Sequence, residues 1–127
     1  PVKPSYDRLY LGIDLSTQSV TGVLLDHHLQ PVRSAVSVNF DESFPEYDTK
    51  AGMCLGPNGI VTSPVSMWLR AFDALFSELK ETGLLSKVAA ISCSGQQHGS
   101  VFWTKAGLER LADPPSSASS FAEVLTA

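Results

Sequence analysis

Alternating apolar and polar positions near the start of the chain predict a β-hairpin. In the first run every second residue is apolar, as on the buried face of a strand. These residues are Leu9, Leu11, Ile13 and Leu15. The second run, residues 20–25, is rich in β-branched and long aliphatic side chains, which favour strands. The polar residues 14–19 between the two runs then form the tip of the hairpin.

The same pattern continues into a third strand. Residues 26–29, an aspartate, two histidines and a leucine, predict a turn, and alternation from Val32 to Phe40 predicts the strand that follows it. Three short strands joined by tight turns make an antiparallel meander. For His27 and His28 a solvated turn is favoured over a metal site, because no third ligand lies nearby in the sequence.

A loop and then a helix follow the meander. Residues 41–62 lose the periodicity, and their acidic side chains, prolines and glycines predict a long loop over the sheet. Ser63 suits the N-cap of a helix, Pro64 its first position and Gly83 its end. Apolar side chains at three- and four-residue spacing predict a helix face that packs on the sheet. They are Val65, Trp68, Leu69, Phe72, Leu75, Phe76 and Leu79.

The last predicted core element is a strand over residues 88–94. Its residues are almost all small or apolar, which is typical of a central strand covered on both faces. A right-handed crossover through the helix makes this strand parallel to the first one. The order β-β-β-α-β predicts an α/β fold with a mixed sheet. The loop 94–100 should then lie near the ligand crevice at the sheet edge, and a strand resumes at residues 101–103.

Composition narrows the class of protein. The 127 residues carry a net charge of −4, which offers no basic surface for nucleic acid. The sequence has neither an apolar run of membrane-spanning length nor a signal peptide, so we expect a soluble domain without a membrane partner. Cys54 and Cys93 are too few for a disulfide scaffold and indicate reduced thiols in an intracellular, cytoplasmic protein.

The hairpin tip and the loop 94–100 carry the candidate chemistry. At the tip, Asp14 can hold a hydrated Mg²⁺ that bridges phosphates, while backbone N–H groups and the hydroxyls of Ser16 and Thr17 donate to phosphate oxygens. The alternative is an ordinary hairpin with polar turn residues. The loop contains two glutamines and His98, whose donors and acceptors suit a polyhydroxylated ligand. The alternative there is a polar turn in which His98 caps backbone groups.

Two motifs in this order resemble the start of a sugar kinase of the FGGY carbohydrate kinase family. They are GIDLSTQS at residues 12–19 and SGQQHG at residues 94–99. Within the family the sequence is most similar to xylulose kinases of the eukaryotic type. The segment between the motifs supports this, with FDESFPEYDT at residues 40–49 and TSPV at residues 62–65.

The resemblance implies both a fold and a reaction. Members of the family have two ribonuclease H-like domains of the actin–hexokinase type, with sugar and ATP meeting between them. Residues 1–8 would then be a lead-in, residues 9–103 an incomplete N-terminal domain, and residues 104–127 a linker and the start of the next element. The implied reaction transfers the ATP γ-phosphoryl group to the terminal hydroxyl of D-xylulose and gives D-xylulose 5-phosphate.

The resemblance also implies roles for particular residues. Asp14 matches the acidic residue associated with Mg²⁺ and phosphate, and the adjoining phosphate-facing turn is matched by Ser16, Thr17 and Gln18. Gln97, His98 and Gly99 fall on the loop that contacts the ketose. Of these, His98 is the main candidate for a hydrogen bond to a sugar hydroxyl. The implied cofactors are ATP and Mg²⁺.

The chain departs from the family in its length. FGGY kinases are several times longer, and their catalytic-base aspartate follows a tryptophan in a later segment, so we expect it beyond Ala127. Asp113 lies in the linker-like residues 113–117 and is poorly placed for a general base. We therefore expect the N-terminal portion of a D-xylulose kinase, inactive without the remainder of the enzyme.

Three alternatives remain open at this point. The first is a short non-catalytic protein with a sugar-binding or regulatory role. The second is another kinase of the FGGY family that acts on a different polyol. The third is a ribonuclease H-like nuclease, which needs several carboxylates on the sheet to hold two metals. Only Asp14 lies on a predicted core strand, which disfavours the nuclease.

Overall fold

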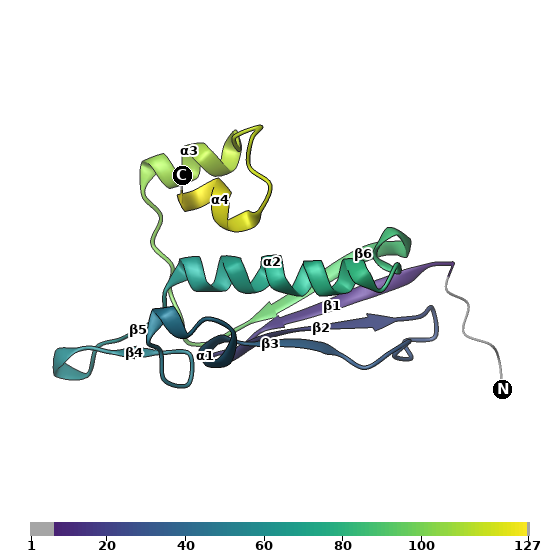
Figure 1. Ribbon diagram of the computed structural model, residues 1–127, viewed down its shortest axis with the longest axis horizontal. Coiled ribbons are helices and arrows are strands. Elements are labelled where there is room, and N and C mark those ends of the chain that lie inside the picture. Colours follow the sequence, from purple (N-terminus) through teal and green to yellow (C-terminus); the bar gives the residue numbers. More distant parts are fainter. Residues whose placement is uncertain (1–6, 127) are drawn as a thin grey trace.

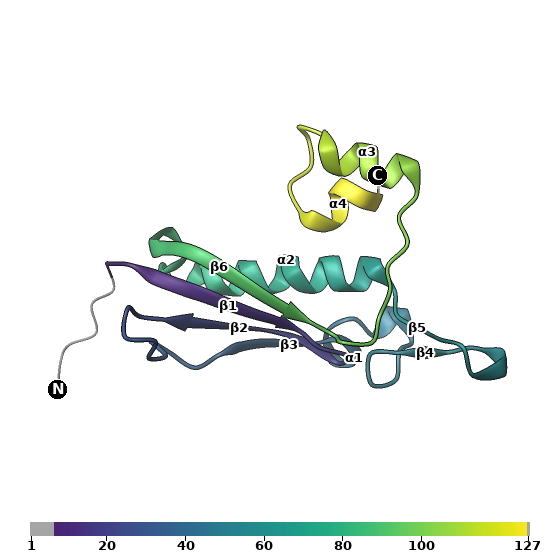
Figure 2. The same ribbon diagram turned by 180° about the vertical axis from the view of Figure 1, so that it is seen from behind.

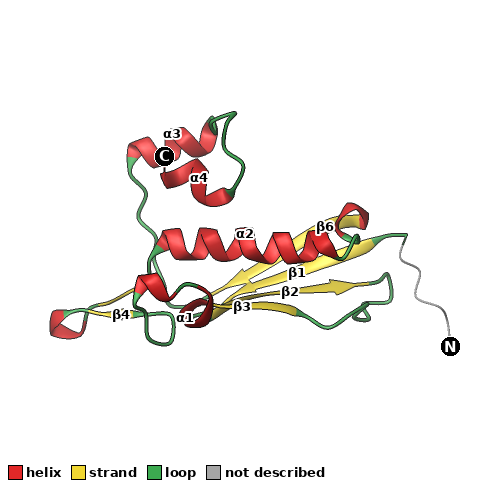
Figure 3. Cartoon of the chain, in the orientation of Figure 1, coloured by secondary structure: helices red, strands yellow, loops and turns green. Residues whose placement is uncertain are grey.

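A four-stranded sheet with one long helix against one face forms the body of the chain (Figure 1). The computed structural model describes residues 7–126, so residues 1–6 of the predicted lead-in lie outside the described residues. The strands and the helix, in chain order, are β1 (Leu9–Leu15), β2 (Ser19–Leu25), β3 (Val36–Asn39), α2 (Val65–Glu81) and β6 (Val88–Gly95). The sheet order is β3-β2-β1-β6, with β6 parallel to β1 and the other pairs antiparallel. The predicted α/β class with a mixed sheet is confirmed (Figure 3).

The hairpin and the turn after it form as predicted. β1 and β2 pair up to Leu15 and Val20, next to the tip. After β2, the buried carboxylate of Asp26 accepts hydrogen bonds from the backbone N–H groups of His28, at 2.8 Å, and Gln30, at 2.9 Å. These bonds satisfy an otherwise costly buried charge and fix the turn. They also lower the pKa of Asp26, with the Gln30 bond contributing most.

The third strand is shorter than the alternation predicts. Residues 36–39 pair continuously with β2. Nearer the turn, pairing is limited to a bridge between Leu25 and Pro31 and a 3.0 Å hydrogen bond from the Val32 N–H to the Leu24 carbonyl, and the exposed residues 33–35 interrupt the strand. The prediction of a long loop over residues 41–62 is wrong in part, since this segment contains several elements too short to produce a periodic pattern. They are α1 (Phe40–Ser43), the 3₁₀ helices η1 (Pro45–Tyr47) and η2 (Pro57–Gly59), and the hairpin of β4 (Cys54–Leu55) and β5 (Val61–Thr62).

Helix α2 begins one residue later than predicted. Pro64 is its N-cap, without a side-chain cap, because the Ser63 hydroxyl donates instead to the carbonyl of Gly52 at 2.7 Å. The helix ends at Glu81, and Gly83 follows with a φ of +70°. Glycine adopts this left-handed conformation readily, so the predicted end of the helix is confirmed.

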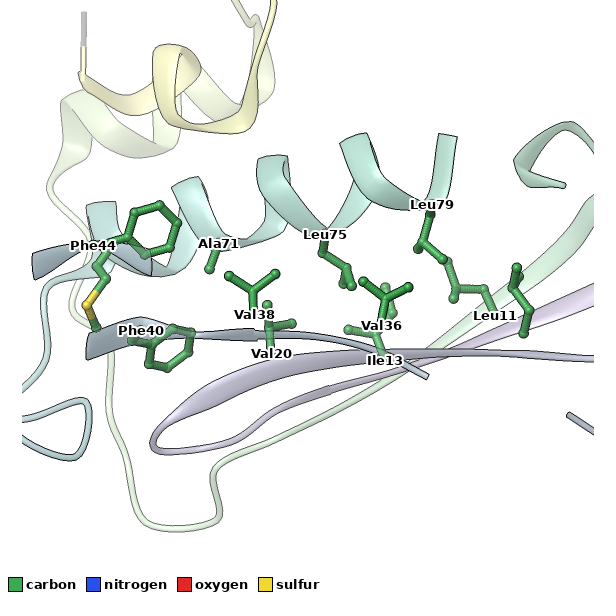
Figure 4. Packing of buried hydrophobic residues seen from close by; sticks show 12 residues of the cluster. Leu11, Ile13, Val20, Val36, Val38, Phe40, Phe44, Ala71, Leu75 and Leu79 are labelled. Carbon is green, nitrogen blue, oxygen red and sulfur yellow. The ribbon is translucent and has the colours of Figure 1, made fainter. Parts of the chain in front are cut away.

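A row of α2 side chains at four-residue spacing forms the core with the sheet (Figure 4). The row is Met67, Ala71, Leu75 and Leu79, all buried. Leu75 and Leu79 thus confirm part of the predicted face. Trp68, Phe72 and Phe76 are only half-buried, because the helix meets the sheet along one side alone. Phe76 lies instead on the flank that faces the last helix, α4 (Phe121–Thr126).

β6 is an edge strand, and the prediction of a central strand covered on both faces is wrong. Its residues after Val88 are all exposed, and Ile91 keeps 54% of its surface accessible. The reason is that α2 packs over β2 and β3. Within residues 7–126 no strand pairs with the outer edge of β6. An unpaired edge of this kind invites pairing with another chain or segment.

The predicted strand at residues 101–103 is also wrong. These residues have no regular structure, and Phe102 is 92% exposed, because no neighbouring strand is within reach to pair with them. The chain leaves the sheet here and forms α3 (Lys105–Ala112), which was not predicted, and α4. Both helices lie on the side of α2 that faces away from the sheet (Figure 2). None of the helices between residues 7 and 126 is long and apolar enough to cross a membrane.

Candidate functional site

Asp14 stands where β1 meets β6. The parallel register places Asp14 opposite Ser94, and the Ser94 hydroxyl donates to its Oδ1 at 2.5 Å. Oδ2 accepts a hydrogen bond from the hydroxyl of Ser16 on the hairpin tip. These bonds lower the pKa of Asp14, the Ser16 bond contributing most, against a small opposing effect of desolvation. The exposed carboxylate is therefore ionised at neutral pH and available to a cation.

Asp14 faces a shallow hollow on the side of the sheet opposite α2. It alternates along β1 with Ile13, whose side chain belongs to the core, so the two point to opposite faces. The hollow has a volume of about 310 Å³. Its lining comes from three strands and comprises Gly12, Ile13, Asp14, Thr21, Val23, Ser92, Cys93 and Ser94. Within residues 7–126 no three His, Cys, Asp or Glu side chains are grouped so that they could hold a metal ion.

The hairpin tip is held rigidly by backbone contacts. The Ser16 N–H donates to the Ser19 carbonyl at 2.9 Å, and the Phe40 N–H donates to the Gln18 carbonyl at 2.9 Å. The Ser16 and Gln18 side chains are exposed, and Thr17 is half-buried. The three tip residues of the predicted phosphate site thus lie next to Asp14 on one short, fixed turn.

The loop after β6 borders a second hollow. The Gln96 N–H donates to the Leu15 carbonyl at 2.9 Å, which carries the pairing one residue past the strand, and the loop then runs over the N-terminal end of α2. The hollow has a volume of about 300 Å³. Its lining comes from the 53–65 segment, α2 and the loop, and comprises Met53, Val61, Thr62, Ser63, Val65, Trp68, Gln96, His98, Gly99, Ser100 and Val101.

The structure brings some predicted sugar-site residues together and leaves one apart. His98 and Gly99 both line the second hollow, whereas Gln97 lies outside its lining. Sequence reasoning missed Trp68 and Ser63 as pocket residues. Trp68 belongs to the apolar stripe of α2, so its spacing in the sequence is that of a core residue. Its buried Nε1 has no hydrogen-bond partner among the described residues. The available signal was their position, because Ser63 lies in the TSPV segment of residues 62–65 and Trp68 follows it closely.

Asp14 and His98 occupy different hollows at one end of the sheet. β1 and β6 are parallel, so their carboxyl ends lie together. Asp14 is the second-last residue of β1, and the 96–100 loop directly follows β6. The two sets of lining residues share no member. An anion or metal beside Asp14 and a polar ligand beside His98 could therefore bind at the same time.

Curated xylulose kinases match most of the chain. The chain is 43% identical over 108 residues to xylulose kinase 2 of Arabidopsis thaliana, covering 83% of this chain and 19% of that protein. It is 45% identical over 104 residues to the xylulose kinase of Schizosaccharomyces pombe, covering 81% and 18%. It is 44% identical over 98 residues to the xylulose kinase of Mus musculus, covering 76% and 18%. No protein-family model matches the chain.

A solved structure agrees with these matches. The crystal structure of a xylulose kinase from Brucella ovis superposes with a TM-score of 0.59 at 26% identity, covering 72% of this chain and 17% of that one. The chain thus spans less than one fifth of the length of each of these relatives. Over most of its own length, the chain is similar in sequence and in fold to xylulose kinases.

Proposed function

We propose that the chain is the N-terminal portion of a cytoplasmic, ATP-dependent kinase of the FGGY carbohydrate kinase family that phosphorylates D-xylulose. The observation that carries the proposal is identity of 43–45% to xylulose kinases over about four fifths of the chain. We assign the mixed sheet to a ribonuclease H-like domain of the actin–hexokinase type, a proposal that the sheet order β3-β2-β1-β6 supports. Two free cysteines, Cys54 and Cys93, fit a reducing compartment.

The hairpin tip is the phosphate side of the proposed site. The ionised, exposed carboxylate of Asp14 fits a hydrated Mg²⁺, a hard cation that keeps several waters and takes few protein ligands. Such an ion supplies charge neutralisation for the phosphates of ATP. Ser16, Thr17 and Gln18 are proposed to face those phosphates, with Ser16 and Ser94 orienting the carboxylate through the hydrogen bonds described above.

The hollow beside the 96–100 loop is the sugar side. The ring nitrogens of His98 can form hydrogen bonds, which suits a hydroxyl of a ketose. Gly99 allows the backbone to approach the ligand, and Gln97 is proposed as a further polar contact from the same loop. We assign no general base within the chain, because Asp113 follows α3 on an exposed segment and lines neither hollow. The base is assigned to the remainder of the enzyme.

A chimaeric enzyme tests this proposal. Residues 9–103 would replace the matching segment of the Schizosaccharomyces pombe xylulose kinase, and ADP release would be followed with D-xylulose. We expect xylulose-dependent turnover within about tenfold of the unaltered enzyme, because Asp14 and His98 are both supplied by the insert. A folded chimaera without such turnover would contradict the proposal. The 127-residue chain alone is the control and should release no ADP.

A further inference from the structure

One carboxylate in the segment after β3 organises a turn that lies between the hairpin tip and the hollow that contains His98. Asp41 Oδ1 accepts hydrogen bonds from the Thr49 hydroxyl, at 2.6 Å, and from the Gly52 N–H, at 3.0 Å. Its Oδ2 accepts from the Ala51 N–H at 2.6 Å. Lys50 and Met53 close the same turn by exchanging two backbone hydrogen bonds of 2.9 and 3.1 Å. A half-buried carboxylate that accepts three hydrogen bonds is a strong local anchor that holds the turn in place, because hydrogen bonds to an ionised group are stronger than those between neutral groups.

Gly52 connects this turn to the hairpin tip. A Cβ placed on Gly52 would lie only 1.9 Å from the carbonyl oxygen of Thr17, so only glycine allows the two backbones to come this close. The Phe40 N–H, directly before Asp41, reaches the same tip through the Gln18 carbonyl. The turn held by Asp41 therefore packs against the hairpin tip, which is the phosphate side of the proposed site.

Gly52 also connects the turn to the sugar side. Its carbonyl accepts the hydrogen bond from the Ser63 hydroxyl at 2.7 Å, and Ser63 and Met53 line the hollow that contains His98. The same peptide unit thus lies between Thr17 and Ser63.

We infer that Asp41 is a positioning residue that holds the hairpin tip and the sugar pocket in a fixed relation through Gly52. The inference rests on the proposed function and adds to it a residue that contacts neither ligand. Transfer between a phosphate and a hydroxyl requires the two to be aligned, and a displacement of about 1 Å can lower the rate on the order of 100-fold. Loss of the anchor should therefore affect the rate more than the binding of either substrate.

Asp41→Asn is the informative change. The asparagine keeps the size and one acceptor oxygen, but in either orientation its NH₂ group faces a backbone N–H donor, that of Ala51 or that of Gly52, so one of these two bonds is lost. Asp48→Asn is the matched control. Asp48 lies in the same segment, is exposed and has a left-handed backbone with φ of +49°, which asparagine also tolerates. Both variants lose one negative charge.

Amide hydrogen exchange on the 127-residue chain gives the first readout. We follow the Ser16 amide at the tip and the Met67 amide in the first turn of α2, with the amides paired between β1 and β2 as the internal reference. Asp41→Asn should raise exchange at Ser16 and Met67 by about tenfold or more, while Asp48→Asn leaves both unchanged. Unchanged exchange at Ser16 in Asp41→Asn would overturn the inference, and this result does not depend on kinase activity.

Kinetics of the chimaera give the second readout. Asp41→Asn should lower kcat by about 10- to 100-fold and change the KM values for ATP and xylulose by less than about threefold. A residue with a merely structural role would lower the melting temperature and leave kcat at 25 °C unchanged, which would overturn the inference. If Asp41→Asn does not fold, Thr49→Val removes one donor to the same carboxylate from a residue that lines neither hollow, and it should lower kcat in the same way to a smaller extent. An inactive parent chimaera would count against the proposed function, and the exchange result would still decide the role of Asp41.

Discussion

Replacing Gly52 by alanine should destabilise the chain more than the same replacement of Gly59. Both glycines have a left-handed backbone, with φ of +74° and +76°, so each alanine costs about 1–2 kcal/mol for an L-residue in that conformation. Beyond this shared cost the two positions differ. A Cβ on Gly52 lies 1.9 Å from the Thr17 carbonyl oxygen and 3.1 Å from the Phe40 ring, whereas nothing lies within 4 Å of a Cβ on Gly59.

The contact with Thr17 sets the size of the difference. Forcing an extra carbon into a packed position costs about 1–3 kcal/mol, so Gly52→Ala should lose about 2–5 kcal/mol in all and Gly59→Ala about 1–2 kcal/mol. A loss of the larger size is a substantial part of the usual 5–15 kcal/mol for a domain. It should leave Gly52→Ala largely unfolded at low urea concentrations.

Urea unfolding followed by far-ultraviolet circular dichroism measures both losses by linear extrapolation. Gly59→Ala is the control for backbone strain alone. Equal urea midpoints for the two variants would refute the reasoning, because the close approach of Gly52 to Thr17 would then not exist in solution. A larger midpoint shift in Gly52→Ala than in Gly59→Ala would support it.

Three further predictions follow from the site and the core. The pKa of Asp14, measured by carboxyl ¹³C NMR, should lie below 3.8 and rise in Ser16→Ala more than in Ser94→Ala. The pKa is lower in the folded than in the unfolded chain, so the stability that these bonds contribute is present at neutral pH and is lost as the pH falls through the folded pKa. The chain should self-associate through the open edge of β6, and Ile91→Lys should reduce its mass by light scattering; a wild-type monomer would contradict this. Leu75→Ala should cost about 2–5 kcal/mol in urea unfolding, and a loss below about 1 kcal/mol would place Leu75 outside the core.

The strands of the hairpin could be predicted because their pattern depends only on local burial. Leu9, Leu11 and Ile13 alternate with polar or small residues, and the same side of β1 meets α2 in the structure. Helix α2 was predictable for the same reason. Its start was misplaced by one residue because Ser63 bonds to Gly52, a partner eleven residues earlier that no local pattern indicates.

β6 shows where composition misleads. Its continuous small and apolar residues fit a covered strand, yet residues 7–126 supply no cover for it. The apolar composition of β6 indicates a strand that suits burial, whereas burial in the structure depends on which described residues pack against it. The exposed residues 101–103 failed in the same way, because a strand needs a neighbour to pair with.

The residue types of the candidate site could be predicted from the sequence, but their arrangement in space could not. Asp14 and His98 stood out as polar residues beside predicted strands, and the resemblance to a kinase family gave them roles. The Ser94 bond to Asp14 depends on the parallel register of β1 and β6, which the sequence does not specify. Asp41 looked like one acidic loop residue among several, because its three donors come from a turn that only the fold reveals.

The division of the site into a sugar side and a phosphate side is the central claim, and it has a direct kinetic test. In the chimaera, His98→Ala removes one uncharged hydrogen bond to the ketose, worth about 0.5–1.5 kcal/mol. The KM for xylulose should therefore rise by about two- to tenfold or more, while the KM for ATP stays within about twofold. His27→Ala is the control, since His27 is an exposed histidine in the turn after β2.

Asp14→Asn in the same chimaera completes the measurement. It should lower kcat through lost metal and phosphate positioning and leave the KM for xylulose nearly unchanged. The account predicts these opposite effects from the two hollows, with His98 in one and Asp14 in the other. A xylulose KM that is the same in His98→Ala as in His27→Ala would contradict it, and His98 would then be a structural turn residue.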